Sequence, residues 1–317
     1  MSLSNIYPEK YKIEKTISYI CNCEYKYFLN KSNVVGIGCG YKIKNGFYTN
    51  QLCIQVFVRK KLPLNELNTN DLIPSTYKGI PTDIKETGGF TACSLTQKIR
   101  PTPGGYCISN EYNTDYSGTL GCLVKDNKHL FLLSNNHVLA MMNKLSLGTK
   151  IIQPSGHFGG DSKTDTIATL SKYIEIKFIE DRGIYFNYTD CSIAKIIDKS
   201  LVSPEIALVG IPKGITTPEL NKNVKKVGAI SELTTGVITS IHNTITVDYY
   251  TIKKSAIFKE QIVTTKLAES GDSGCILLDE NNNAIGLLMS GSENVSTFNP
   301  IDTVLKELNV NLVTSKI

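Results

Sequence analysis

The sequence predicts a mainly β protein that begins with a small α+β module and ends with a helix. Three observations support this prediction. From Leu120 onward, short apolar runs alternate with turn residues at short intervals, as in β-rich domains. Before that point, an amphipathic stretch is followed by two strand-like runs. Near the end, Ile301, Val304, Leu305 and Leu308 recur at helical spacing.

The N-terminal hundred residues are expected to form a helix in 1–32 and a small α+β module in 33–100. The helix is predicted over Pro8–Asn30, because proline suits a first helical turn and an apolar stripe follows it. The stripe consists of Ile13, Ile17, Ile20, Phe28 and Leu29. Strands are predicted at Asn33–Tyr41 and Gln51–Val58, and a short helix with irregular chain over Lys60–Gly89.

Residues 101–205 and 206–317 are expected to form two β-rich halves. Thr102–Ser117 is rich in Pro, Gly, Asn and Ser and is predicted to be a linker. Strands in the first half are predicted at Gly121–Lys125, His129–Ser134, Lys150–Gln153, Asp165–Ile176 and Cys191–Ile197. Those in the second half are predicted at Val224–Ile230, Gly236–Ile241, Thr244–Ile252, Gln261–Leu267, Gly274–Leu278 and Ala284–Ser290. Asn299 is expected to cap the last helix and Pro300 to begin it.

Composition excludes several classes of protein. The 34 basic and 29 acidic residues leave a net charge of +5 that is spread along the chain, so no nucleic-acid partner is expected. No apolar run reaches the roughly 18 residues of a membrane span. The nine cysteines are irregularly spaced, and the N-terminus resembles no export signal. We therefore expect reduced thiols and a cytoplasmic location.

Three short segments contain the residue types of nucleophilic catalysis. His137 follows the apolar run that ends at Ser134, Asp190 opens another apolar run, and Ser273 lies in the glycine turn Gly271–Gly274. A serine hydroxyl is a weak nucleophile that needs a neighbouring base, and histidine accepts protons near neutral pH. A carboxylate on the far ring nitrogen fixes the histidine tautomer. The amides of Gly271 and Ser273 are predicted to form an oxyanion hole, where one donor contributes about 10²–10³ in rate.

The order of the motifs resembles that of the trypsin-like, chymotrypsin-fold serine proteases of the PA clan. Their spacing is 53 residues from His137 to Asp190 and 83 from Asp190 to Ser273. The resemblance is closest to the cytoplasmic or HtrA-type bacterial branch, in which Asn-Asn precedes the histidine and Ile-Ala follows the aspartate. The segment from Lys226 to Val237 resembles the strand before the substrate cleft of that branch. The resemblance implies a chymotrypsin-like double β-barrel over roughly 118–308, with His137 and Asp190 on the first barrel and Ser273 on the second.

The same resemblance implies a serine endopeptidase that acts on a protein or peptide. Leu267 lies six positions before the predicted nucleophile, where trypsin has an acidic residue. The leucine favours an apolar or small substrate side chain in the first pocket. Met289, Ser290 and Gly291 are expected to line the pocket wall. Asp272 is expected to pair with a group inside the chain, since an unpaired buried carboxylate is costly and no activating cleavage is expected.

Two alternatives to an endopeptidase with restricted substrates and regulated activity stay open at this point. One is a catalytically silent binding scaffold with the protease fold, and the other is a protease that processes itself within 102–117. A regulatory protein partner is expected to dock, if at all, on the N-terminal module. No metal or cofactor is expected, because Cys21 and Cys23 lack a second pair of ligands.

Overall fold

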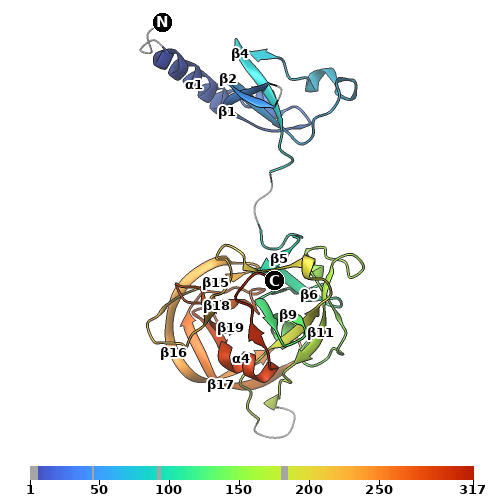
Figure 1. Cartoon of the computed structure of the whole chain (residues 1–317), viewed down its shortest axis with the longest axis vertical. Helices are drawn as coiled ribbons and strands as arrows, with labels where there is room; N and C mark the ends of the chain where they lie inside the picture. The colour runs from blue at the N-terminus through green and yellow to red at the C-terminus, as the bar shows by residue number, and fades with distance from the viewer. Residues whose placement is uncertain (1–5, 45, 91–93, 180–184) are drawn as a thin grey trace. The chain divides into compact units, whose positions relative to one another are not determined.

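The computed structural model describes residues 6–44, 46–90, 94–179 and 185–317, which form two compact units (Figure 1). The first unit is Met1–Cys93 and the second is Ser94–Ile317. The boundary therefore falls at 93/94, and the segment after Ser94 belongs to the larger unit, where Leu95 packs in the core. Among the described residues, no helix is both long and apolar enough to cross a bilayer.

The smaller unit packs its helices against a four-stranded sheet of order β1-β2-β4-β3. Its elements are α1 (Ile6–Cys23), α2 (Lys26–Leu29), β1 (Val34–Lys44), β2 (Phe47–Val58), β3 (Thr76–Tyr77) and β4 (Ile80–Glu86), with 3-10 turns at Leu64–Glu66 and Thr69–Asp71. The predicted apolar stripe is confirmed at Ile17, Ile20 and Phe28, which are buried against β2. Leu29 is exposed instead. The prediction of helix and irregular chain over Lys60–Gly89 missed β4, which pairs with β2 in parallel.

The first barrel of the larger unit is an eight-stranded sheet of order β21-β8-β9-β12-β11-β10-β6-β7. Its strands are β6 (Cys107–Asn110), β7 (Gly118–Thr119), β8 (Cys122–Lys125), β9 (Leu130–Ser134), β10 (Lys150–Ile152), β11 (Thr166–Tyr173), β12 (Ser192–Ile196) and β21 (Asn311–Leu312). Helix α3 (Asn136–Leu139) follows β9, and one-turn 3-10 helices lie at Gly156–Phe158 and Lys199–Leu201. The interior of this first barrel is filled by aliphatic side chains such as Leu120, Leu132 and Ile167.

The second barrel is a seven-stranded sheet of order β14-β19-β18-β15-β16-β17-β20, and a further β19–β20 pairing closes it. Its strands are β14 (Gly214–Ile215), β15 (Asn223–Gly228), β16 (Glu232–Tyr249), β17 (Lys254–Thr265), β18 (Ile276–Leu278), β19 (Asn283–Gly291) and β20 (Val295–Pro300). The pairing leaves β15 to β20 without an open edge, which suits a stable antiparallel barrel. The mainly β double-barrel fold, with its N-terminal α+β module and C-terminal helix, is confirmed.

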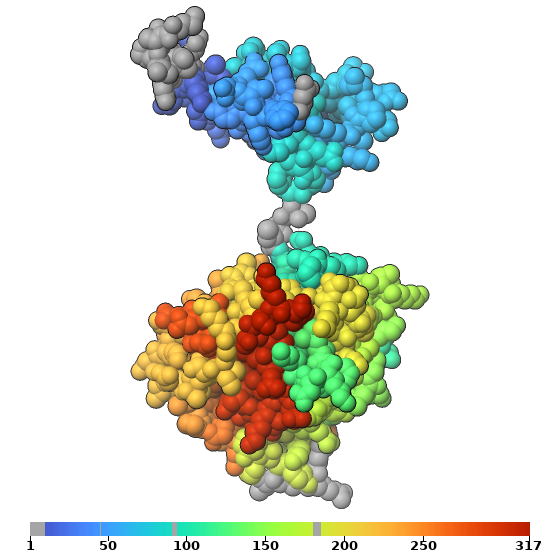
Figure 2. Space-filling model, viewed as in Figure 1, coloured from blue at the N-terminus to red at the C-terminus, as the bar shows by residue number. Residues whose placement is uncertain are grey.

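A shared apolar cluster joins the two barrels. It contains Leu133 and Ile193 from the first barrel, Val227 and Leu287 from the second, and Ile301 from α4 (Ile301–Leu308). The C-terminal segment, coloured red, lies at the surface between green and yellow segments of this unit (Figure 2). The predicted linker Thr102–Ser117 is wrong in its first half. Residues there form β6 and also β5 (Thr102–Gly104), which pairs in parallel with β13 (Val202–Ile206).

Candidate active site

His137 and Asp190 meet because two neighbouring strands of the first barrel run in opposite directions. β9 ends where β12 begins, with Ser134 paired to Ser192. The residues just after β9 and those just before β12 therefore lie at the same edge of the sheet. His137 Nδ1 lies 2.6 Å from Asp190 Oδ2, and the His137 amide donates to Asp190 Oδ1 at 3.1 Å. The Asp190 side chain is fully buried, whereas that of His137 is 22% exposed.

The backbone of Asp190 is held on both sides by buried amide side chains. Asn135 Nδ2 donates to the Asp190 carbonyl at 2.7 Å, and the Asp190 amide donates to Asn299 Oδ1 at 3.0 Å. Asn299 also donates to Gln261 Oε1 at 2.6 Å. The prediction that Asn299 caps the last helix is wrong, since Pro300 occupies that position and no side chain caps α4. The Asn299 side chain instead accepts from the buried Asp190 amide, which would otherwise lack a partner.

Tyr249 is a member of the site that the sequence analysis missed. Its hydroxyl donates to Asp190 Oδ2 at 2.9 Å. Burial, and then the neighbouring Asp190 charge, raise the pKa of Tyr249 well above its ordinary value, so the phenol keeps its proton. The sequence contains no local signal for this contact, because β16 brings Tyr249 across from the second barrel.

Ser273 lies on a turn that the first barrel holds by its backbone. The Thr119 amide donates to the Ser273 carbonyl at 2.8 Å, and Thr119 Oγ1 donates to the Gly271 carbonyl at 3.0 Å. Gly271 has φ of +101°, a conformation that suits glycine. In the described part of the chain, neither the Gly271 amide nor the Ser273 amide has a hydrogen-bond acceptor. Both amides are therefore available to an incoming oxygen.

Asp272 forms a buried ion pair with Lys226. Lys226 Nζ lies 2.9 Å from Asp272 Oδ2, and both side chains are fully buried. The amides of Ile230, Ser231 and Glu269 also donate to this carboxylate, at 2.9, 3.1 and 2.9 Å. Burial by itself would raise the pKa of Asp272, but the Lys226 charge and these hydrogen bonds outweigh it and hold the pKa below its ordinary value. The prediction of a partner inside the chain is confirmed.

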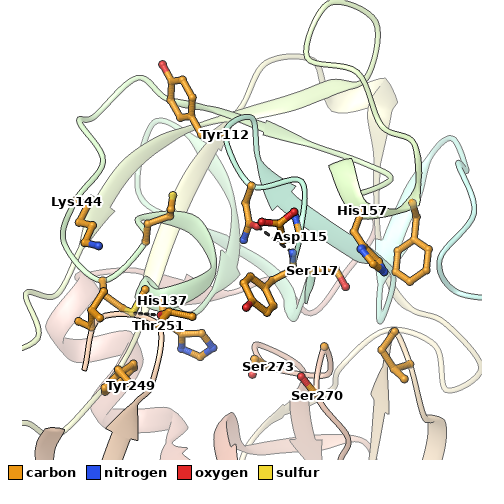
Figure 3. Close-up of a pocket in the computed structure, with 18 residues that line it drawn as sticks. Tyr112, Asp115, Ser117, His137, Lys144, His157, Tyr249, Thr251, Ser270 and Ser273 are labelled. Carbon is orange, nitrogen blue, oxygen red and sulfur yellow. Dashed lines mark hydrogen bonds between the residues drawn. The ribbon is translucent and has the colours of Figure 1, made fainter. Parts of the chain in front are cut away.

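A cavity of about 490 Å³ opens between His137 and Ser273 (Figure 3). Figure 3 shows the His137 ring and the Ser273 side chain facing this space, with Tyr249 on the side of His137 away from Ser273. Within the described residues, no hydrogen bond joins Ser273 to His137. Such bonds commonly form only when substrate is present. The wall combines aromatic and aliphatic side chains with polar and charged ones. The first group includes Tyr112, Tyr116, Phe158, Met141, Met142, Ile230 and Ile252, and the second includes Asn113, Asp115, Lys144, His157 and Thr251.

Part of the cavity wall has a strained backbone. Met141, Met142 and Asn143 have φ of +47°, +56° and +69° in succession. Side chains other than glycine rarely adopt this region, so the surroundings must enforce it. Asn143 does so by donating to the Ile176 carbonyl at 2.8 Å and accepting from Asn136 Nδ2 at 2.7 Å. Both methionines line the cavity.

The four residues predicted for the first substrate pocket do not line this cavity. Leu267 is buried in the core of the second barrel, and Met289 is buried beside Tyr249. Ser290 Oγ lies 2.5 Å from Thr297 Oγ1, and Gly291 ends β19. None of the four is among the described residues that line the cavity. The pocket assignment stays a prediction.

Comparisons with known proteins identify no close relative. No protein-family model matches the sequence, and no curated protein matches it. Among solved structures, the chain is similar to Thermobifida fusca protease A, with 22% identity, 67% of this chain and 98% of that chain covered, and a TM-score of 0.49. It is also similar to Cellulomonas bogoriensis chymotrypsin, with 19% identity, and to a Nocardiopsis protease, with 15% identity. Each of these matches covers 67% of this chain and 98% of the other, with a TM-score of 0.47. At these values the likeness assigns no activity to this chain.

Proposed function

We propose that the chain is a serine endopeptidase that hydrolyses peptide bonds with Ser273, His137 and Asp190. One observation supports this most directly: His137 faces the cavity that Ser273 lines, while its Nδ1 is bonded to the buried Asp190 carboxylate. An imidazole held in this way presents its second nitrogen to a reacting hydroxyl. The two amides without acceptors, at Gly271 and Ser273, add a place for negative charge.

In the proposed reaction, Ser273 Oγ attacks the carbonyl carbon of the peptide while His137 Nε2 accepts the hydroxyl proton. The carbonyl oxygen becomes an anion that the Gly271 and Ser273 amides stabilise. His137 then gives its proton to the leaving amine, and the peptide bond breaks to leave an ester on Ser273. A water molecule, deprotonated by His137, attacks the ester. As the C–O bond to Ser273 breaks, His137 returns the proton to Ser273 Oγ and the acid is released. Asp190 stays ionised and stabilises the imidazolium.

We further propose that substrates are protein segments with an apolar residue beside the scissile bond. The aromatic and methionine side chains of the cavity wall support this, because apolar walls gain most from burying apolar groups. Restricted substrates, regulation through the N-terminal module and a cytoplasmic location stay proposals from the sequence. Exposed Tyr11 and Tyr19 on α1 offer the module a surface for a protein partner.

The experiment that tests the proposal is covalent labelling by a peptidyl phosphonate, combined with turnover of a peptide library. We expect wild-type protein to be labelled once and to cleave peptides, and Ser273→Ala to do neither. Ser270→Ala is the matched control, because Ser270 lines the same cavity next to Gly271. It should retain labelling. Labelling that persists in Ser273→Ala, or a wild-type chain that is neither labelled nor active, overturns the proposal and favours a silent binding scaffold.

A further inference from the structure

The Asp190 carboxylate accepts three hydrogen bonds, and one of them comes from the second barrel. His137 supplies its amide to Oδ1 and its Nδ1 to Oδ2, while Tyr249 OH donates to Oδ2 at 2.9 Å. Among the described residues, no other side chain hydrogen-bonds this carboxylate. The hydroxyl group of Ser290, in the predicted pocket wall, is bonded to Thr297 instead. Tyr249 and His137 thus share one carboxylate oxygen.

The Tyr249 ring is held firmly in place by its neighbours. It is only 8% exposed, and it meets the Phe178 ring edge to face at 5.6 Å. Met289 belongs to the same apolar cluster. On its open side the ring lies 6.2 Å from the His137 ring and lines the cavity. A ring held on these sides can move its hydroxyl only if the surrounding structure moves as well.

The strand pair that carries Tyr249 is fastened to the first barrel. Tyr249 is the last residue of β16 and pairs with Lys254 at the start of β17. Farther along β17, the Asn187 amide donates to the Ile257 carbonyl at 2.9 Å, and the Lys259 amide donates to the Asn187 carbonyl at 2.9 Å. Asn187 precedes Asp190 by three residues. The second barrel is therefore tied to the segment that leads into Asp190.

We propose that Tyr249 is a positioning residue of the site, whose hydroxyl fixes the rotation of the Asp190 carboxylate against His137. The inference rests on the proposed hydrolysis for its functional meaning. A carboxylate bonded only to His137 could rotate and weaken the short Nδ1–Oδ2 contact as the imidazole gains charge. A phenol that keeps its proton is suited to this task, because it donates and never competes as a base. Triad alignment then depends on the β16–β17 hairpin as well as on the first barrel.

The test compares Tyr249→Phe with Tyr250→Phe. Both variants lose one hydroxyl in the same hairpin, but Tyr250 is 85% exposed and lies outside the cavity wall. Tyr249→Phe keeps the ring that lines the cavity. We expect kcat to fall roughly 10- to 100-fold with KM little changed, as for a lost hydrogen bond to a charged group. The low-field proton NMR signal of His137 Nδ1–H should also move. Tyr250→Phe should change neither.

Wild-type kcat together with an unmoved Nδ1–H signal in Tyr249→Phe overturns the inference. A fall in stability alone, with both readouts unchanged, does so as well. If the wild-type chain shows neither turnover nor phosphonate labelling, the proposed function fails. The NMR comparison then decides by itself whether Tyr249 sets the His137–Asp190 bond. Should Tyr249→Phe not fold, Phe178→Leu replaces it, because it loosens the ring and leaves the hydroxyl. There, a lower kcat at constant KM supports the inference and an unchanged kcat overturns it.

Discussion

The hydroxyl of Thr119, on a strand of the first barrel, donates a 3.0 Å hydrogen bond to the carbonyl of Gly271, on a turn of the second. The same hydroxyl accepts from the Ala229 amide at 3.0 Å. Thr119 also donates its amide to the Ser273 carbonyl. One residue therefore holds the carbonyl groups of Gly271 and Ser273, on either side of Asp272, and fixes the turn that carries the two amides without acceptors.

Replacement of Thr119 should damage turnover more than binding. In Thr119→Val the Gly271 carbonyl loses its donor and the Ala229 amide its acceptor, so the turn can relax. We expect kcat to fall about 10- to 100-fold, since each lost bond contributes on the order of 1 kcal/mol. Thr119→Ser keeps the hydroxyl and is the control. Steady-state kinetics on a cleaved peptide would measure both, and equal kcat in the two variants would contradict the prediction.

Loss of Lys226 should unfold the turn beside Ser273. In Lys226→Met the Asp272 charge stays buried without its partner, which typically costs about 3–5 kcal/mol. Lys225→Met is the matched control, because Lys225 is the neighbouring residue of β15 and donates to the Glu280 carbonyl at the surface. Denaturant unfolding curves should show a large loss for the first variant and wild-type stability for the second. Similar unfolding curves for Lys226→Met and Lys225→Met would contradict the prediction.

Acid should weaken the protein partly through Asp272. Its folded pKa lies below the ordinary carboxyl value, so its stabilising contribution is complete above about pH 4. That contribution is lost as the pH falls through the lower folded pKa. Asp272→Asn removes the titrating group. We expect this variant to be less stable at pH 7 and to lose less free energy of unfolding between about pH 4 and 2. Parallel pH profiles of unfolding would be the contrary result.

Gly274 should tolerate no side chain. Its φ is +95°, and an added Cβ would lie 2.6 Å from the Thr119 carbonyl oxygen and 2.1 Å from Ser134 Oγ. Gly274→Ala should therefore cost about 3 kcal/mol or more, from backbone strain and overpacking together. Gly148→Ala separates the two causes, because Gly148 has φ of +92° and open space around it. It should cost about 1 kcal/mol. Thermal unfolding of both variants measures the difference.

Thiol reagents should distinguish the exposed cysteines from the buried ones. Burial raises the pKa of Cys122 to about 12, and it raises the pKa of Cys191 and Cys275 as well. Alkylation needs the thiolate and access to it. In native protein at neutral pH, iodoacetamide should modify exposed Cys23 and spare these three, whereas denatured protein should react throughout. Peptide mass spectrometry resolves the sites, and rapid native alkylation of Cys275 would be inconsistent with the structure.

The elements that the sequence predicts well are those with strong local periodicity. α1, the β8–β9 hairpin and β19 follow from apolar patterns and turn residues alone. The predicted gap between strands 236–241 and 244–252 lies inside β16, where His242 has φ of +58° and the register with β17 shifts. A bulge of this kind interrupts the apolar alternation without ending the strand.

The contacts that complete the site depend on residues far apart in the chain. β20 was missed because its buried positions include Ser296, Thr297 and Asn299, which read as loop residues when their partners are unknown. The same reason hid Tyr249, since a tyrosine near a turn gives no sign of an acceptor 59 positions earlier. Motif order alone suggested the three reacting groups. The side chains that hold these groups, such as Asn299 and Tyr249, are identified only by the three-dimensional structure.

The Lys226–Asp272 pair has a consequence for how the molecule comes into working order. Because the cation is built into the polypeptide, no newly liberated chain end is required to shape the neighbouring turn. Folding of the chain therefore also forms the turn that carries Ser273. For the proposed peptidase, control of activity would then act on access to the cavity and not on the formation of this turn.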